Sequence, residues 1–504
     1  MSSSYPNNPT QSASLILRAA GMHPALPFGD LFCAAALESL LRKHDVRFGC
    51  RADHIYNPVL TLWALLGQCL SDCLDCAAIV MAVAAPRIAF HLDPCSYATG
   101  ACCIARSRIP VALLSDLAYL FGERLEDNAP ACWRWHGRRA LLVDGTTLSG
   151  PDTPANQAKY PQSRSQKPGL GFPLIRLVVV LGLASGAAVA AAVAPWHGKG
   201  NGETSLLRRL LERFRAGDLL VADRAYGVFP LVVLLRQRDV DVCFRVQQEA
   251  SKRATGRRLK RLGKDDYLVE WSKPPRPSWM DKDTYQALPD TVELREVHSH
   301  IDKPGCRAKH VVLVSTLTAL NEKGKPAINV EDIRGLYIKR WNAALDIRSL
   351  KSEMGMDILS GQTPDMMERE IWAHLVTYNL TRRLQASAAL WRGCQPRQLS
   401  FALAQKALRE NRKELSTFDD ARYEQLAETM VKGAASRVVG KKPDRYEPRR
   451  RKRREKISRL LMVPREQARQ AVAQGAEANQ PKTRRKKKSQ TQPQQQAATT
   501  ASPQ

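Results

Sequence analysis

The spacing of hydrophobic positions changes along this chain. Between residues 31 and 135, apolar runs at helical spacing predict a domain made of helices. From residue 136 onward, short apolar runs bounded by Gly, Pro or Asp predict strands that alternate with helices. The strands are expected at residues 140–143, 174–183, 187–193, 219–222 and 240–246, with helices at 203–215 and 229–236. This order predicts a mixed α/β sheet with flanking helices.

The pattern becomes more polar and Pro-rich from about residue 247 to 325, where short strand-like runs predict a β-rich insertion. Helices are expected again at residues 329–352 and 366–391. The two ends have too little apolar content for a core, so we expect disorder at residues 1–30 and in a basic tail at 436–504. The α/β domain with its insertion would then occupy residues 136–435.

One stretch is apolar enough to raise the question of a membrane span. Residues 177–194 contain no charged side chain, which is just the length that a spanning helix needs. Ser185 and Gly186 divide this stretch into a Val/Leu-rich half and an Ala/Val-rich half. Two buried strands joined by a tight turn fit that division better, so no membrane segment is expected.

The charge of the chain indicates a polyanionic partner. The 504 residues include 77 Lys and Arg against 49 Asp and Glu, a formal net charge of +28. Residues 441–504 hold 19 basic and 5 acidic residues, so half of the excess lies in the tail and half in the folded body. Nucleic acid is the first candidate partner.

The cysteines and the N-terminus point to a reducing compartment. Twelve cysteines are few for this length and are irregularly spaced, and residues 1–14 lack the basic start and apolar core of a secretion signal. We therefore expect a cytoplasmic protein. Cys73 and Cys76 form a CxxC pair, but no second pair follows at zinc-site spacing, which favours buried free thiols over a metal site.

Two aspartates stand directly after predicted strands. Asp144 follows the apolar run in LLVDGTTL, and Asp223 follows the run in LLVADRAYG. Ligands and metals collect at such strand ends in α/β sheets, and two carboxylates there can hold Mg²⁺, with Mn²⁺ as a substitute. The alternative is that each Asp caps a turn.

A third candidate element is the predicted helix around YIKRWNAALDIRSLK. At about 100° per residue, Tyr337, Arg340, Arg348 and Lys351 fall on one face, beside an apolar stripe that could dock on the sheet. Such a face could grip a phosphate backbone, or it could be a solvated basic surface.

Together these motifs resemble those of DDE transposases of bacterial insertion sequences, in particular the insertion-sequence-4 group. That group has Asp in a V-D-G/S-T context, Asp in D-R-x-Y/F, and a helical Y-x2-R-x3-E-x6-K signature. This chain has VDGTT at Asp144, DRAYG at Asp223, and Tyr337, Arg340 and Lys351 at the spacing of the signature. The resemblance extends from about residue 30 to 455.

The resemblance implies a ribonuclease-H-like core and Mg²⁺-dependent cutting of the element's ends, followed by attack of the freed 3′-hydroxyl on target DNA. It implies that Tyr337, Arg340 and Lys351 hold phosphates and terminal nucleotides. The partners would be the terminal inverted repeats and target DNA, bound by a homodimer in the synaptic complex.

The chain departs from the signature at one position. Ala344 stands where the family has its catalytic Glu, and Asp346 would point away from the basic face. Three hypotheses follow: a transposase with impaired catalysis, a non-catalytic DNA-binding derivative or inhibitor of one, and a metal-dependent nuclease unrelated to transposition.

Overall fold

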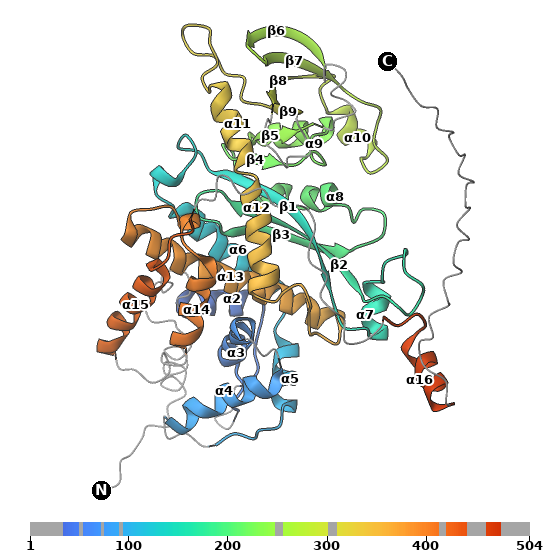
Figure 1. Ribbon diagram of the computed structural model, residues 1–504, viewed down its shortest axis with the longest axis vertical. Helices are drawn as coiled ribbons and strands as arrows, with labels where there is room; N and C mark the ends of the chain where they lie inside the picture. The colour runs from blue at the N-terminus through green and yellow to red at the C-terminus, as the bar shows by residue number, and fades with distance from the viewer. Residues whose placement is uncertain are drawn as a thin grey trace, which may run out of the picture. The chain divides into compact units, whose positions relative to one another are not determined.

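The computed structural model describes residues 34–49, 54–71, 75–89, 94–246, 256–300, 310–412, 420–440 and 460–474. Contacts divide the chain into two units, residues 1–163 with 172–449 and residues 164–171 with 450–504. The first unit carries all of the strands described below (Figure 1). In the second unit the described part includes helix α16 (Arg465–Ala473), within the tail that was expected to be disordered. The predicted disordered N-terminus and both Arg/Lys runs of the tail lie outside the described residues.

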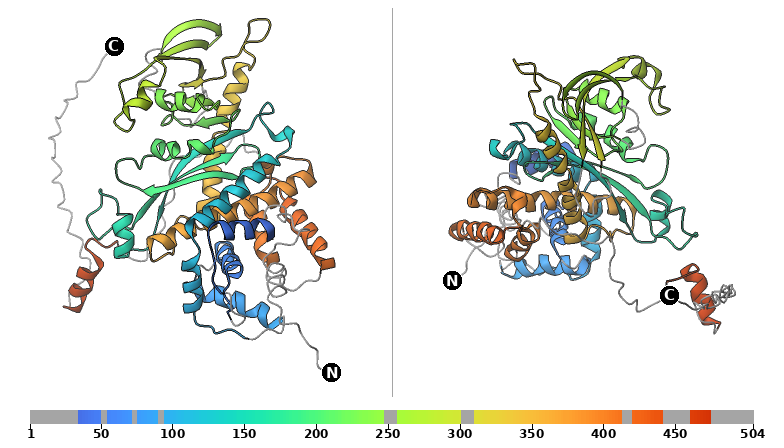
Figure 2. Two further views of the ribbon diagram at one scale, coloured as in Figure 1. Left: turned by 180° about the vertical axis from the view of Figure 1, so that it is seen from behind. Right: turned by 45° about the horizontal axis from the view of Figure 1, so that its top comes forward.

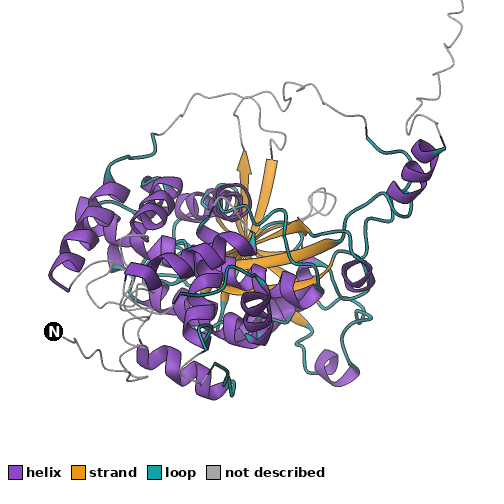
Figure 3. Cartoon of the chain, turned by 90° about the horizontal axis from the view of Figure 1, so that it is seen from below, coloured by secondary structure: helices purple, strands orange, loops and turns teal. Residues whose placement is uncertain are grey.

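The strands lie together in one mixed sheet (Figure 3). Their order is β3-β2-β1-β4-β5-β9-β8-β7-β6. Strands β1, β4 and β5 run parallel at its centre, and the other pairs are antiparallel. The strand bounds are β1 (Ala140–Ser149), β2 (Leu174–Gly182), β3 (Ala188–Pro195), β4 (Leu219–Ala222), β5 (Asp241–Arg245), β6 (Arg257–Gly263), β7 (Asp266–Ser272), β8 (Thr291–His300) and β9 (His310–Ser315).

Helices precede, interrupt and follow the sheet. Before it come α2 (Ala34–Lys43), α3 (Pro58–Leu70), α4 (Cys76–Ala89), α5 (Gly100–Arg108) and α6 (Val111–Asp127). Between strands lie α7 (Pro154–Lys159), α8 (Glu203–Arg208), α9 (Phe229–Arg236) and α10 (Lys282–Gln286). After it come α11 (Val330–Ile338), α12 (Trp341–Arg348), α13 (Pro364–Arg392), α14 (Phe401–Arg412) and α15 (Asp420–Ala435).

The two faces of the sheet bury different helices. On β1, Leu142 and Leu148 face a core shared with α3, α6, α12 and α13, in which α6 and α13 run side by side (Figure 2). Leu141 and Val143 face the opposite core, which includes Leu206 and Leu207 of α8 and the apolar side of α9. This alternation follows from the two-residue repeat of a strand.

The mixed α/β architecture is confirmed, and so is the strand pair in the uncharged stretch. Residues 177–194 lie in β2 and β3, which pair with each other and are almost completely buried. A helical span is therefore wrong for this segment. Across the described ranges, no helix combines the length and the hydrophobicity needed to cross a membrane.

Three details of the prediction are wrong. Strand β1 does not end at Asp144 but continues to Ser149, because β2 pairs with it along that whole stretch. The helix expected at residues 203–215 is α8 followed by a separate 3₁₀ turn. The helix expected at 329–352 is interrupted after Ile338 and ends in a π-helical turn.

The strands expected in the insertion are present, and they extend the central sheet through the β5–β9 pair.

Candidate functional site

Asp144 and Asp223 lie at matching positions on neighbouring parallel strands. The last residue pair between β1 and β4 is Leu142 with Val221, and each aspartate comes two residues later along its own segment. The two side chains therefore start on the same face of the sheet, the one that carries α12. Strand β4 ends at Ala222, and the next pairing of β1 on this side among the described residues is the isolated parallel bridge between Ser149 and Ile358.

Four groups of effects act on the pKa of the Asp144 carboxyl, two upward and two downward. Burial raises the pKa of its carboxyl, and the nearby Asp223 carboxylate raises it further. The Gly145 N–H, which donates to Asp144 Oδ1 at 2.9 Å, and the Arg340 guanidinium both lower it, but the net shift is upward. Asp223 is half-buried and accepts a hydrogen bond from the Arg224 N–H at 2.7 Å. Within the described part of the chain, neither aspartate is in an ion pair with a cationic side chain.

The first half of the basic signature reaches these aspartates. Helices α11 and α12 follow each other across the sheet face (Figure 1), and Arg340 lies at the turn between them. Its guanidinium stacks near the rings of Tyr337 and Trp341, at 5.7 and 4.9 Å from the ring centres. Burial raises the pKa of Tyr337 to about 12, and Asp223 is among the charges that act on its hydroxyl. Tyr337 and Arg340 thus lie within electrostatic reach of the two carboxylates.

The residues in the second half of the signature do not continue one unbroken helix from those in the first half. The Lys351 ammonium lies in the π-helical turn and donates to the Thr147 carbonyl of β1 at 2.8 Å. Arg348 is exposed at the end of α12. The methyl group of Ala344 is half-buried, on the helix that docks through Ala343 and Ile347.

The carboxylate of Asp346, two residues after Ala344, is paired with two arginines of other segments. It is 2% exposed and forms ion pairs with Arg382 of α13 and, at 2.6 Å, with Arg397. Arg382 also donates to the Tyr378 hydroxyl at 2.8 Å. This network fixes α12 to α13, so Asp346 cannot take the place of the glutamate that the resemblance implies at position 344.

The sequence prediction missed three residues around the aspartates. Glu203, the first residue of α8, is close enough that its carboxylate and those of Asp144 and Asp223 act on one another. Tyr226 is completely buried, and all three carboxylates raise the pKa of its hydroxyl. Arg245 ends β5 one residue after the Ala222–Phe244 pair, at the level of Asp223, and acts on Tyr337. Two of them had a local signal, Tyr226 as the tyrosine of the DRAYG motif and Arg245 as a charged residue that ends a strand.

The donor set around the two aspartates suits a hard divalent cation. Each carboxylate accepts one backbone N–H, through its Oδ1 atom. Carboxylate oxygens are the ligands that Mg²⁺ prefers. In the ranges that the structure describes, no group of three or more His, Cys, Asp or Glu side chains is arranged to hold one ion together. Two carboxylates on adjacent strands are therefore the core of the candidate site.

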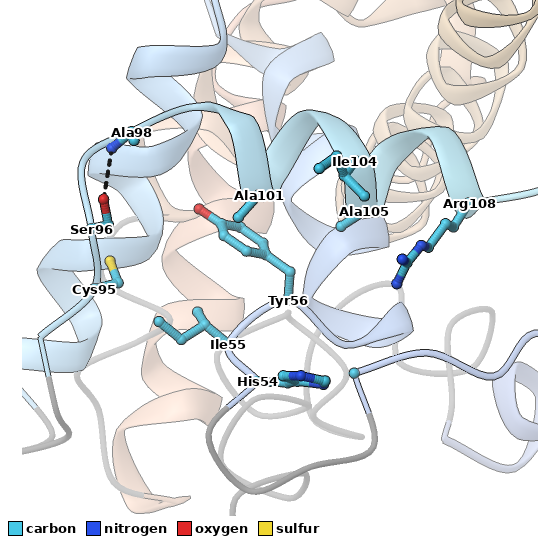
Figure 4. A pocket seen from close by; sticks show the side chains of 11 residues that line it. His54, Ile55, Tyr56, Cys95, Ser96, Ala98, Ala101, Ile104, Ala105 and Arg108 are labelled. Atoms are coloured by element: carbon cyan, nitrogen blue, oxygen red, sulfur yellow. Dashed lines mark hydrogen bonds between the residues drawn. The ribbon is translucent and has the colours of Figure 1, made fainter.

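A separate cavity of about 390 Å³ lies in the N-terminal helical region (Figure 4). It is lined by residues that include His54, Tyr56, Cys95 and Arg108, and it contains none of the residues predicted from the sequence motifs. Nearby, Cys76 accepts a hydrogen bond from Arg106 at 2.9 Å. Cys73, the other half of the CxxC pair, lies outside the described residues.

Comparison with known proteins identifies sequences that are similar to this chain. Residues 135–380 match the family model described as transposase DDE domain. Over 283 residues the chain is 27% identical to transposase InsG for insertion sequence element IS4 of Escherichia coli (strain K12). That alignment covers 55% of this chain and 60% of the relative, so the chain spans about three fifths of its length. Residues 135–380 are therefore similar to the transposase DDE domain, and the chain is similar to an insertion-sequence-4 transposase.

Proposed function

We propose that this chain is the transposase of a bacterial insertion sequence, acting in the cytoplasm on the terminal inverted repeats and on target DNA. The observation that carries this proposal is the placement of Asp144 and Asp223 at one level of two parallel strands, with Tyr337 and Arg340 against them. The order β3-β2-β1-β4-β5, with three antiparallel strands followed by two parallel ones, supports a ribonuclease-H-like core.

In the proposed reaction, water attacks a phosphorus atom at the element's end. The bond from that phosphorus to the 3′-oxygen breaks, and the 3′-oxygen leaves as a hydroxyl. This hydroxyl then attacks a phosphorus of target DNA, forms a new phosphodiester, and displaces a target 3′-hydroxyl. No oxidant or reductant is needed, and the number of phosphodiester bonds is conserved in the joining step.

The chain's own groups would hold the reacting phosphate. Arg340 is buried beside Asp144, and its Nε has no hydrogen-bond partner among the described residues, so it can donate to a phosphate oxygen. Lys351 and the exposed Arg348 would bind the backbone further along the strand. Asp144 and Asp223 would hold Mg²⁺, or Mn²⁺ in its place. When bound, this ion would activate the attacking hydroxyl or water and stabilise the leaving oxygen.

Ala344 leads us to propose that the chemical step is slow in this chain. With two aspartates instead of three acids, the site has less negative charge to bind cations. The experiment compares end cleavage and strand transfer by the wild type, Ala344→Glu and Asp144→Ala on a duplex carrying the element's own terminal repeat. We expect the Ala344→Glu protein to be at least ~10-fold faster, about 1.4 kcal/mol in activation free energy.

Equal rates for the wild type and Ala344→Glu would overturn the proposed impairment. Cutting without strand joining would favour the unrelated nuclease instead. Loss of all cutting in Asp144→Ala, with end binding retained, supports the transposase.

The missing glutamate also favours a second candidate, a DNA-binding derivative that occupies the ends or joins mixed dimers with an active copy. This candidate predicts salt-sensitive, end-specific binding and no cleavage by the wild type. The two candidates are separated by long incubation of the wild type in Mn²⁺, where cleavage that disappears in Asp144→Ala excludes the second.

A further inference from the structure

Two cysteines of the N-terminal helical region lie in direct contact. Cys76 begins α4 and Cys103 lies in α5, 27 positions later, and their sulfur atoms are 3.6 Å apart, with the Cys103 thiol donating to Cys76 Sγ. Both thiols are free, and reagents can reach the pair because Cys103 is exposed and Cys76 is half-buried. A small closing movement would bring the two sulfur atoms to the ~2.05 Å of a disulfide bond.

A buried arginine donates to the same sulfur atom. Arg106 is 5% exposed, and its Nη1 donates to Cys76 Sγ at 2.9 Å. Among the described residues this guanidinium forms no ion pair with a carboxylate, and its Nε has no hydrogen-bond partner. A buried cation without a counter-charge is costly, so Arg106 stabilises negative charge that forms on Cys76. Since the thiolate is the nucleophile in cysteine chemistry, Cys76 is placed to be the attacking sulfur.

The neighbouring thiols are placed for other roles. Burial raises the pKa of the Cys103 thiol, and its hydrogen bond to Cys76 raises it further, so Cys103 keeps its proton until Cys76 has reacted. Cys102 is completely buried among apolar side chains of α3 and α4, and burial raises the pKa of its thiol to about 11. In the part of the chain that the structure describes, no cluster of ligating side chains suits a metal ion, so the contact between Cys76 and Cys103 does not belong to a metal site.

We infer that Cys76 and Cys103 are a reversible oxidation site, which forms a disulfide between α4 and α5 when the protein meets a peroxide. The Cys76 thiolate attacks one peroxide oxygen, the O–O bond breaks, and Cys76 becomes a sulfenic acid while the other oxygen leaves and is protonated to water. The Cys103 sulfur then attacks Cys76 Sγ, the S–O bond breaks, and the oxygen leaves as water with the Cys103 proton. Two thiols thus lose two electrons, which reduce one peroxide to two waters.

The disulfide would restrain a part of the protein that few buried contacts hold in place. Helix α4 packs against α3 and α5 through a small apolar cluster that is separate from the two cores on the sheet. Segments of this kind open locally more easily than a core does. A covalent link from the first residue of α4 to α5 removes part of that freedom. The inference is independent of the proposed function, because it needs neither DNA nor a metal ion.

The test treats the reduced full chain with hydrogen peroxide, blocks the remaining thiols with iodoacetamide, and sequences linked tryptic peptides by mass spectrometry. We expect a link between Cys76 and Cys103 in the wild type, its release by dithiothreitol, and no such link in Cys103→Ala. Cys132→Ala is the matched control, because Cys132 is also exposed but lies in the separate 3₁₀ turn Ala131–Trp133, and it should leave the link unchanged. Absence of the link in the wild type, or a link from Cys76 to Cys73 or Cys102 instead, would overturn the inference.

A second variant tests which sulfur attacks. Arg106→Met should slow formation of the disulfide about 10-fold, because the thiolate of Cys76 loses its stabilising cation. Arg108→Met, at an exposed position of the same helix, is the control and should react like the wild type. Equal rates for both variants would overturn the assignment of Cys76 as the attacking sulfur.

Hydrogen exchange of the α4 amides measures the restraint. These amides should exchange more slowly in the oxidised than in the reduced wild type, and peroxide should leave their exchange unchanged in Cys103→Ala. Circular dichroism verifies that each variant is folded. Equal exchange in the oxidised and reduced wild type would show that the disulfide does not restrain α4, and that part of the inference would be wrong.

Discussion

Two groups of buried charges in this domain differ in how they are balanced. Around Asp346, one carboxylate faces two guanidinium groups, and the guanidinium of Arg382 also donates to the Tyr378 hydroxyl and to the Gln385 side chain. Around Asp144, three carboxylates lie within electrostatic reach of one another, Arg340 acts on Asp144 and Arg176 acts on Glu203, and no direct ion pair joins the carboxylates to either arginine in the described residues.

The difference separates a structural role from a functional one. A buried charge that is fully paired is costly to break and needs nothing from outside the protein. Carboxylates that repel one another and are poorly compensated raise the free energy of the folded chain until a cation binds. The contrast predicts opposite responses of stability and activity when one member of each group is removed.

The largest effect is expected for Asp144→Asn on cleavage. Loss of this carboxylate should slow end cleavage roughly 1,000-fold, about 4 kcal/mol in activation free energy, since metal-ion catalysis contributes several kcal/mol. The free energy of unfolding should stay the same or rise, because one of the repelling charges is gone. Single-turnover cleavage and urea unfolding measure the two quantities, and a strongly destabilised variant would contradict the comparison.

Asp346→Ala should show the reverse pattern for stability. Removing this carboxylate leaves Arg382 buried without its counter-charge, so the free energy of unfolding should fall by about 3 to 5 kcal/mol. Urea unfolding measures the loss, and Glu424→Ala, at an exposed position of α15, serves as the control. If both variants unfold alike, the network around Asp346 is not what holds α12 in place.

A smaller effect is expected for Lys351→Met on DNA affinity. If Lys351 binds a phosphate in addition to the Thr147 carbonyl, the slope of log affinity against log salt concentration should decrease by about 0.9. Lys339→Met, in the exposed turn before Arg340, is the matched control. Fluorescence anisotropy at several salt concentrations gives the slope, and an unchanged slope would make Lys351 purely structural.

The smallest effect is on the pH dependence of stability. The carboxyl groups of Asp144 and Glu203 have pKa values raised above their ordinary 3.8 and 4.5, so the folded state binds their protons more tightly than the unfolded state does. Their contribution is fully present below pH 3.8 and is lost as the pH rises through the raised pKa values.

The urea midpoint of Asp144→Asn relative to wild type, measured in EDTA, should therefore increase as the pH rises above about 4. Excess Mn²⁺ should suppress this difference, because the cation takes over the role of the protons. If the difference in urea midpoint between Asp144→Asn and wild type shrinks as the pH rises, the pKa of Asp144 is not raised in the folded protein.

Local patterns predicted much of this domain because burial repeats at short range. The Val/Leu and Ala runs of β2 and β3, the Leu run of α8 and the two aspartates after apolar residues are all visible within ten neighbouring positions. Tyr337 and Arg340 come to the aspartates because the chain docks α11 and α12 through their apolar stripe.

The missed features depend on contacts between distant segments. The polar residues after Asp144 resemble a turn, and only pairing with β2 keeps them extended. All residues from 337 to 353 suit an α-helix, so nothing local indicates the interruption at Lys339 or the π-helical turn that carries Lys351. Glu203 lies 58 positions after Gly145, and their contact exists only once the sheet has formed.

The ion-pair network at Asp346 separates the folding of α12 from the chemistry beside it. Position 344 contributes no hydrogen bond to that attachment among the described residues, so a mutation there can remove an acid without unfolding the protein. A lineage that loses its glutamate at this codon would therefore keep an abundant, well-folded protein, and selection on folding alone would never remove it. An alanine codon of the form GCA or GCG regains glutamate through one nucleotide change, so such a copy stays a single mutational step from its ancestor's sequence at that position.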